Sequence, residues 1–296
     1  MVNTHILTAE FDYLEPETVP EALHLLGKYA RRAKVIAGGT DLLVQMKRGN
    51  AKPAYLINIS KIPELRTLAF ERGLSIGPLI PFREVEKSPA IREIYTALFE
   101  AAQSVSSVQI KNMGTLGGNL CHASPAADSA PPLIAFDAQV KVLTEKGERT
   151  LPLEEFFVGP GETVLLPEEM LVSIEVPELS GPTGSAFLKM TRVAADLAKV
   201  NTAVIIARKD GICRDCRIVL GAVFKTPLRV KKAEAILRGK KPGKDLVEEA
   251  SQLASEEIQP ITDNRSTAWY RKEVSKVLVR KALGLAWRRA GGMDIF

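Results

Sequence analysis

The chain has 296 residues, of which 46% are hydrophobic and 25% are charged, and its formal net charge is +5. Such a length suggests two or three domains, and the composition is that of an ordinary soluble globular protein. No apolar run approaches the roughly 20 residues that span a bilayer. Met1–Phe11 is polar and acidic, whereas a signal peptide begins basic and becomes apolar. We therefore expect a cytoplasmic protein without a membrane span.

Much of the positive charge lies in a predicted helix over Ser266–Arg289. Its basic residues alternate with Trp269, Val274 and other apolar residues at helical spacing, and they lack the interleaved exposed aromatics of a nucleic-acid groove. We interpret them as the solvated face of a packed helix, with docking to an acidic partner as the alternative. They are Arg271, Lys272, Lys276, Arg280, Lys281, Arg288 and Arg289.

The three cysteines form no disulfide framework and are too few for an iron–sulfur cluster held by this chain alone. Cys213 and Cys216 have the spacing of half a zinc site, but there is no second pair and the histidines are scattered. We therefore interpret this pair as structural cysteines near a strand start and expect no metal. A zinc site is the minor alternative.

The first 60 residues predict a small α/β unit. Thr18-Val-Pro-Glu21 is a capping box that begins a helix, and apolar residues follow it at helical spacing. Strands are expected over Lys34–Ala37 and Tyr55–Ile59. Between them, Thr40 is expected to cap a short helix that ends at Gly49.

Residues 61–178 predict a sheet interrupted by one helix. Ser88 and Pro89 begin the helix, and its apolar residues lie along one face: Ile91, Ile94, Tyr95, Leu98 and Ala102. The following stretch, Asn112–Pro132, looks like a long loop, and such a loop is usually functional. Strands are expected over Leu74–Leu79, Gln139–Leu143 and Met170–Val176, with a hairpin turn at Lys146-Gly147.

Residues 179–296 predict a separate α+β domain, because strands precede helices. An antiparallel meander is expected over Ser185–Arg192, Lys199–Ala207 and Cys213–Phe224, with the last two strands joined across Asp210-Gly211. Helices are expected near Leu228–Arg238, Asp245–Glu257 and Ser266–Arg289. The fold class is thus α+β: a small α/β unit (1–60), a mixed and antiparallel sheet unit (61–178), and a three-stranded antiparallel sheet with a helix bundle (179–296).

Two glycine pairs stand out. We name their surroundings the first glycine segment, Ala37–Leu42, and the second glycine segment, Thr115–Leu120. Where a strand becomes a helix, converging N–H groups and the helix dipole favour an anion, and missing Cβ atoms let a phosphate approach. Two such segments suit a pyrophosphate held from both sides; the alternative is two turns that only connect elements. Neither a Rossmann fingerprint nor a P-loop occurs.

Five stretches in order across Val35–Leu237 carry a family resemblance. They are Ala37–Leu42, Lys111–Leu120, Ser124–Asp128, Glu169–Pro177 and Phe187–Val200. Together they resemble the flavin subunits of molybdenum hydroxylases, the family of xanthine and carbon monoxide dehydrogenases. The resemblance implies a two-part FAD-binding domain over residues 1–178, followed by a flavoprotein C-terminal domain, with FAD bound non-covalently.

The resemblance also implies which residues bind FAD. Asp128 would accept hydrogen bonds from cofactor hydroxyls, Leu171 would pack near the adenine or flavin ring, and Lys189 would reach the flavin region. Val105 is a looser match. Without the resemblance, Asp128 would be a helix cap, Leu171 core and Lys189 solvent-facing. The pyrophosphate cradle would comprise Val35, Ile36, Ala37, Gly38, Gly39, Thr40, Asp41, Leu42, Thr115, Leu116, Gly117, Gly118 and Asn119.

The implied function is that of an oxidoreductase subunit in a dimer of heterotrimers. It would pass electrons from [2Fe–2S] centres on a small partner subunit to an external acceptor, while a large partner subunit carries the molybdenum cofactor. No catalytic residue is assigned to this chain, and no extra cluster is expected on it. Within the family, the sequence is slightly more similar to xanthine-type subunits, at Asn119–Cys121 and Ala127–Ala130.

Three alternatives stay open. Cys121 or His122 is a conceivable covalent flavin tether. A second alternative is a stand-alone flavin reductase similar to UDP-N-acetylenolpyruvoylglucosamine reductase, whose FAD fold is related, although the third domain here offers no candidate Ser or Glu pair as proton donor. Finally, a scaffold could keep the fold without the cofactor.

Overall fold

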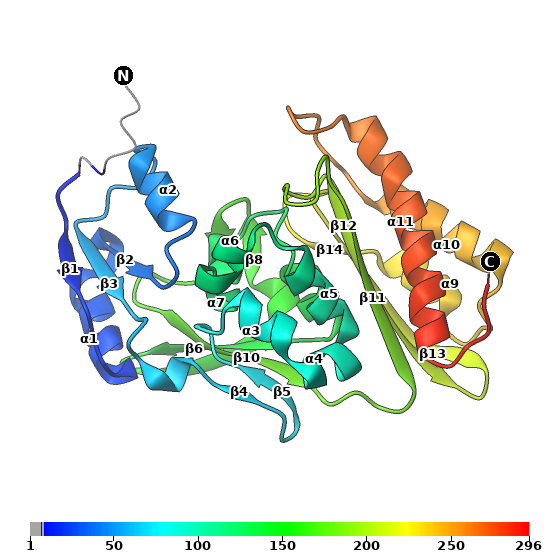
Figure 1. Ribbon diagram of the computed structural model, residues 1–296, viewed down its shortest axis with the longest axis horizontal. Coiled ribbons are helices and arrows are strands. Elements are labelled where there is room, and N and C mark those ends of the chain that lie inside the picture. The colour runs from blue at the N-terminus through cyan, green and yellow to red at the C-terminus, as the bar shows by residue number, and fades with distance from the viewer. Residues whose placement is uncertain (1–6, 8, 296) are drawn as a thin grey trace.

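The computed structural model describes residue 7 and residues 9–295, so His5 and most of the polar N-terminal stretch lie outside the described residues. Three sheet-containing parts lie side by side along the long axis, with the N-terminal part on the left of Figure 1 and the C-terminal part on the right. We name them the first part (β1 to β3), the second part (β4 to β10) and the third part (β11 to α11). Within the described chain, no helix combines the length and apolar character needed to cross a membrane.

The first part is a parallel sheet in the order β1-β3-β2. As predicted, the Thr18 hydroxyl accepts a hydrogen bond from the backbone N–H of Glu21 and begins α1. The elements are β1 (Asp12–Leu14), α1 (Val19–Tyr29), a 3-10 turn (Ala30–Arg32), β2 (Ala33–Ile36), α2 (Leu42–Lys47) and β3 (Tyr55–Asn58).

The expectation that Thr40 caps α2 is wrong. The N-cap residue is Asp41, and its side chain makes no capping hydrogen bond. Gly39 has a φ of 69°, so the chain must complete a left-handed turn before the helix can begin. Gly49, with a φ of 74°, follows the helix end as predicted.

The second part is an antiparallel sheet in the order β4-β5-β10-β6-β7, with six short helices beside it. The predicted hairpin joins β6 to β7. The strands are β4 (Leu68–Ala69), β5 (Gly73–Ile76), β6 (Gln139–Thr144), β7 (Gly147–Pro152) and β10 (Met170–Pro177), with a hairpin of β8 (Phe157–Gly159) and β9 (Glu162–Thr163). The helices are α3 (Phe82–Lys87), α4 (Pro89–Ile94), α5 (Thr96–Ser104), α6 (Val108–Met113), α7 (Leu116–His122) and α8 (Ala130–Ala135), with 3-10 turns over Pro63–Leu65 and Leu153–Glu155.

Two expectations for the second part are wrong. The single helix after Ser88 is two helices, because Tyr95 leaves the helical conformation and packs its ring edge-on against Phe136 at 5.2 Å. That break turns Ile94 out to solvent. The long loop over Asn112–Pro132 instead contains α7 and the start of α8, which are stabilised by packing that local sequence cannot reveal.

The third part is an antiparallel sheet in the order β11-β12-β13-β14. The predicted meander is present, and Leu228–Arg229 adds a short fourth strand where a helix was expected. The elements are β11 (Thr183–Met190), β12 (Val200–Lys209), β13 (Ile212–Gly221), β14 (Leu228–Arg229), α9 (Lys231–Leu237), α10 (Lys244–Glu257) and α11 (Ala268–Arg289).

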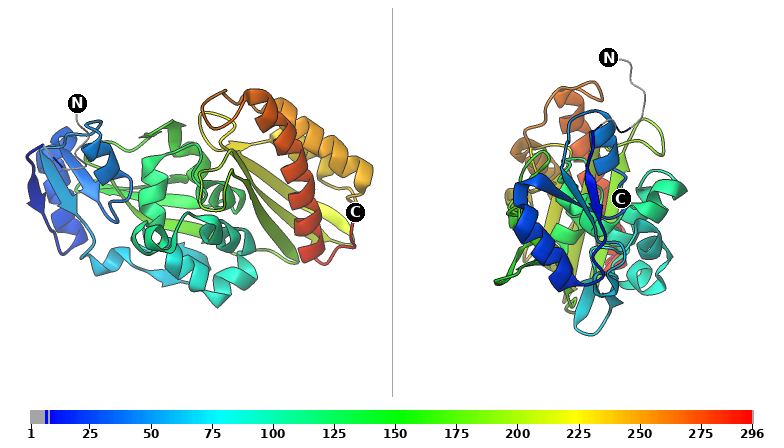
Figure 2. Two further views of the ribbon diagram at one scale, coloured as in Figure 1. Left: turned by 45° about the horizontal axis from the view of Figure 1, so that its top comes forward. Right: turned by 90° about the vertical axis from the view of Figure 1, so that its left-hand side faces the viewer.

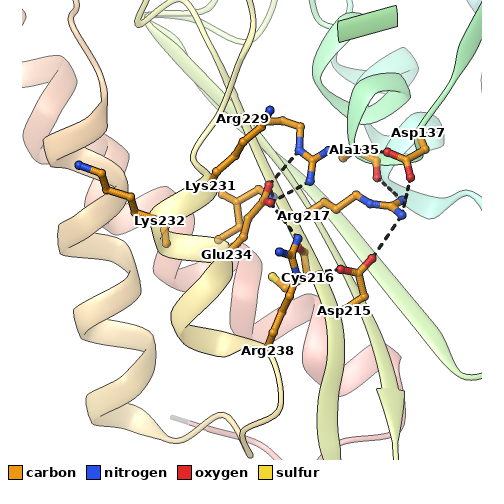
Figure 3. Close-up of polar contacts among 12 residues, drawn as sticks. Ala135, Asp137, Asp215, Cys216, Arg217, Arg229, Lys231, Lys232, Glu234 and Arg238 are labelled. Carbon is orange, nitrogen blue, oxygen red and sulfur yellow. Dashed lines mark hydrogen bonds and ion pairs between the residues drawn. The ribbon is translucent and has the colours of Figure 1, made fainter. Parts of the chain in front are cut away.

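The third-part sheet is covered on both faces. Helix α11 packs on one face, while α5 and α8 of the second part pack on the other, as Figures 1 and 2 show. Consequently, residues 200–207 of β12 are all buried, and Phe187, Ala203 and Val219 join the core of the second part. Ion pairs reinforce this contact across the boundary: Arg217 reaches Asp137, as Figure 3 shows, and Arg229 reaches Glu154.

Helix α11 departs from the predicted solvated basic face at two residues. Arg271 is only 2% exposed, and its guanidinium donates to the carbonyls of Lys199 and Ala222 and to Asp263. Trp269, expected on the packed side, is 71% exposed. Arg271 thus fastens α11 to the loops at one end of the sheet.

Candidate cofactor-binding site

One cavity of about 1300 Å³ is lined by all three parts of the molecule. It exceeds the roughly 300–1,000 Å³ of common small-molecule pockets. Leu116 is the one predicted site residue that is not in the wall, because it is fully buried in the core of the second part. The wall includes Val35, Ile36, Ala37, Gly38, Gly39, Thr40, Asp41, Leu42, Val105, Thr115, Gly117, Gly118, Asn119, Asp128, Leu171 and Lys189.

The first glycine segment presents free backbone donors to this cavity. Within the described chain, the N–H groups of Gly39, Thr40 and Asp41 donate no hydrogen bond. They follow one another between the end of β2 and the start of α2, and the left-handed conformation of Gly39 gives the turn the character of an anion-binding nest. Consecutive unpaired N–H groups at a helix start suit a phosphate.

Gly38 serves a different purpose from the one predicted. A Cβ atom at Gly38 would lie 1.7 Å from the carbonyl oxygen of Met113, immediately before the second glycine segment. The missing side chain therefore lets the first glycine segment pack against Met113 and Gly114, the two residues that precede the second segment. Both segments line the same cavity.

The second glycine segment is helical from Leu116 onward, and the N–H groups at its helix start already have protein acceptors, except that of the N-cap residue Thr115. Leu116 donates to the carbonyl of Ile80, Gly117 to that of Pro78, and Gly118 to the Thr115 hydroxyl at 3.0 Å. A Cβ at Gly117 would lie 2.3 Å from that of Pro78, whereas one at Gly118 would meet only the Thr115 hydroxyl. The free backbone N–H donors for a phosphate thus come mainly from the first segment, and the second segment mainly offers surface and side chains.

A buried polar cluster joins the third part to the cavity wall. Lys189 Nζ donates to Asp128 Oδ2 at 2.6 Å and to the Ser104 carbonyl at 3.3 Å, and Asn201 Nδ2 donates to Asp128 Oδ1 at 2.9 Å. Burial raises the pKa of the Asp128 carboxyl, although the Lys189 ammonium and the Asn201 amide both lower it. The helix-cap and solvent-facing alternatives for Asp128 and Lys189 are therefore wrong.

Sequence reasoning missed Asn201. It stands in an otherwise apolar strand whose other residues up to Ala207 are hydrophobic or Thr, and a buried amide in such a run is uncommon. A fully buried amide beside Thr202 in this run was the available signal.

Cys121 and His122 lie at the far end of α7, also in the cavity wall. The His122 ring is 3.6 Å from the Asp41 carboxylate and 3.3 Å from the Gln45 amide, so it links α7 to the first glycine segment and to α2. Cys121 is exposed and lies in the cavity wall, so the tether alternative stays open for it.

The two other cysteines lie elsewhere. Cys213 and Cys216 are fully buried on β13. Among the described residues, no three His, Cys, Asp or Glu side chains are grouped as metal ligands. The pair belongs to the core of the third part.

A cavity of about 1300 Å³ with free N–H groups at a strand-to-helix turn is the arrangement expected of a protein that binds a phosphate-bearing cofactor. Residues 9–179 match the family model described as the FAD binding domain in molybdopterin dehydrogenase, and residues 185–286 match that of the CO dehydrogenase flavoprotein C-terminal domain. The chain therefore belongs to the family of FAD-binding subunits of molybdenum hydroxylases. FAD is its cofactor, and it is an oxidoreductase subunit, as the motifs predicted.

Individual relatives cover almost the whole chain. The carbon monoxide dehydrogenase medium chain of Hydrogenophaga pseudoflava is 34% identical over 285 residues, which are 96% of this chain and 99% of the relative. The putative xanthine dehydrogenase FAD-binding subunit of Escherichia coli strain K12 is 30% identical over 284 residues, 95% and 97% of the two chains.

A solved structure shares the fold. It is carbon monoxide dehydrogenase from Hydrogenophaga pseudoflava lacking the Mo-pyranopterin moiety, with a TM-score of 0.93, 35% identity, and coverage of 96% of this chain and 99% of that chain. The α+β prediction is thereby confirmed. These identities give no support to the lean toward xanthine-type subunits, and the family match displaces the reductase alternative.

Proposed function

We propose that this chain holds FAD in the cavity and relays electrons from [2Fe–2S] centres on a small partner subunit to an external acceptor. A large partner subunit would carry the molybdenum cofactor, in a dimer of heterotrimers. Relatives named medium chain and FAD-binding subunit support a place in such an assembly. When bound, FAD supplies electron-transfer chemistry, and the protein supplies binding, orientation and electrostatics.

The observation that carries the proposal is the row of free N–H groups at Gly39, Thr40 and Asp41 in a cavity of about 1300 Å³. A diphosphate carries negative charge and many acceptor oxygens, which match such donors. In this proposal, Thr40 adds its hydroxyl, while Gly118 and Asn119 of α7 form the opposite wall.

The remaining wall residues position the rest of the cofactor. Leu171 is apolar and nearly buried, so it offers packing surface to a ring. The Lys189 ammonium is held by Asp128 and by the Ser104 carbonyl, so its charge is fixed at the wall where the second and third parts meet. Because Asp128 balances this charge, the wall offers the cofactor a fixed ion pair whose remaining hydrogen-bonding capacity faces the cavity.

FAD titration of the full chain tests the proposal. We expect stoichiometric uptake, visible as flavin absorption, and no oxidation of purines, aldehydes or carbon monoxide by the chain alone. Gly118→Leu should abolish uptake because its side chain enters the cavity, whereas Gly243→Leu, at a position with nothing within 4 Å, should bind normally. Unchanged FAD affinity in Gly118→Leu, or a wild-type chain that takes up no FAD, would contradict the proposal.

A further inference from the structure

Asn201 is a polar residue in the interior of a core strand. Its side chain is fully buried on β12, where Val200, Ala203 and Val204 are also fully buried. Burying an amide costs free energy unless its hydrogen bonds are made. The amide should therefore serve a purpose that an apolar residue would not.

Its contacts indicate that purpose. The amide nitrogen donates to Asp128 Oδ1 at 2.9 Å and to the Ala127 carbonyl at 3.2 Å. The amide oxygen is buried and has no hydrogen-bond partner in the described chain, so the fold tolerates an unsatisfied acceptor in order to bring the nitrogen to the carboxylate.

The neighbouring strand is shaped around this side chain. Gly221 on β13 is the register partner of Asn201, and a Cβ atom there would lie 2.2 Å from the amide oxygen. Any larger residue would displace the amide. Asn201 and Gly221 of the third part are thus both needed for the hydrogen bond from Asn201 to Asp128 of the second part.

Asn201 itself is not in the cavity wall, whereas Asp128 and Lys189 are. The second oxygen of Asp128 accepts from Lys189 at 2.6 Å. The carboxylate therefore has one fixed donor on each oxygen, both supplied by the third part, and its remaining lone pairs are available to a ligand.

We propose that Asn201 is a positioning residue that orients the Asp128 carboxylate, and through it the Lys189 ammonium, toward bound FAD. This inference rests on the proposed function of the cavity. Removing the amide donor disfavours the ionised carboxylate, so FAD binding that depends on ionised Asp128 should weaken, and its loss on the acid side should begin at a higher pH.

The test is a FAD titration of the full chain across a pH series, with Asn201→Leu compared with Thr202→Val. Thr202 is equally buried on the same strand and donates one hydrogen bond, to the Val219 carbonyl, without contacting Asp128. We expect Asn201→Leu to weaken FAD binding about tenfold near neutral pH, as for a lost hydrogen bond to a charged group, and to shift the acid limb upward. Thr202→Val should change affinity less than about twofold and leave the pH profile in place.

Asn201→Asp gives an independent result if the leucine variant fails to fold. It keeps the size of the side chain, but it donates to Asp128 only when protonated, so its affinity relative to wild type should recover as the pH falls. The inference is overturned if either Asn201 variant has the affinity and pH profile of Thr202→Val. A wild-type chain that binds no FAD would instead overturn the proposed function, and this inference with it.

Discussion

The two glycine segments have similar sequences and different structures. The first is an open turn whose Gly39, Thr40 and Asp41 N–H groups have no acceptor in the described chain. The second is the start of a helix, where the N–H groups of Leu116, Gly117 and Gly118 already have acceptors. A Gly-Gly pair therefore does not by itself identify a phosphate cradle. What distinguishes the two is whether the neighbouring chain supplies acceptors, as Ile80 and Pro78 do for the second segment.

The contact between the segments should be the most sensitive point. In Gly38→Val, the new Cβ would lie 1.7 Å from the Met113 carbonyl oxygen, so the first segment and the backbone around Met113 must separate. We expect complete loss of FAD uptake and about 3 kcal/mol or more of lost stability, at the upper end for overpacking. The third part has its own core, so its unfolding should be least affected. Urea unfolding with an FAD titration measures both, and retained stoichiometric FAD would refute the contact.

A comparison of Gly117→Val with Gly118→Leu should show which glycine of the second segment matters for stability and which for FAD binding. The new Cβ of Gly117→Val would meet Pro78 at 2.3 Å, and the strain is expected to lower the free energy of unfolding by about 1–3 kcal/mol. Gly118→Leu should cost less stability, because the nearest atom to its Cβ is the Thr115 hydroxyl at 2.9 Å, a side-chain atom, and it should cost more FAD affinity, because Gly118 lines the cavity. Thermal unfolding of the two apo variants makes the comparison. Equal destabilisation would mean that Gly118 does not face open space.

Lys111 holds the chain just before the second segment. Its ammonium is 2.7 Å from the Glu86 carboxylate, and both side chains are largely buried. Burial opposes ionisation of Glu86, but hydrogen bonds from Lys111 and Arg83 lower its pKa overall. The ion pair therefore stabilises the fold at pH values above the pKa that Glu86 has in the unfolded chain. This contribution is lost as the pH falls through the lower pKa of Glu86 in the folded protein.

Lys111→Met should therefore cost about 2 kcal/mol at neutral pH, less than a fully broken buried pair, because Arg83 remains beside Glu86. The difference from wild type should shrink in acid as Glu86 becomes protonated. Urea unfolding at neutral and acidic pH measures it. A pH-independent difference would indicate lost packing in place of a lost ion pair.

The smallest effect is expected at Asp41. Its carboxylate lies beside the free N–H groups of the first segment and opposes a bound anion. Asp41→Asn should tighten FAD binding by roughly 0.3–1 kcal/mol at low salt, with a smaller gain at high salt, as for charges at helix starts. Weaker binding at both salt concentrations would mean that the carboxylate, with His122, holds the turn in place.

Local signals predicted the local parts of the fold. The Thr18 cap, the hairpin between β6 and β7, and the turn at Asp210-Gly211 depend on neighbouring residues, so the sequence alone revealed them. The break at Tyr95 and helix α7 depend on distant partners, Phe136 and Pro78, which periodicity cannot supply.

The candidate site divides in the same way. The first glycine segment was predictable from a strand–glycine–helix pattern, although the role of Gly38 was not. Asp128 and Lys189 came from the family resemblance. Asn201 was missed because its importance depends on Asp128, 73 positions earlier in the chain.

Amide hydrogen exchange with and without FAD tests the central claim most directly. Unbonded N–H groups exchange quickly, and a bound diphosphate should protect them. We predict a large gain of protection at Gly39, Thr40 and Asp41, and little change at Leu116, Gly117 and Gly118, which already have acceptors. Protection confined to the second segment, or none in either segment at saturating FAD, would contradict the account.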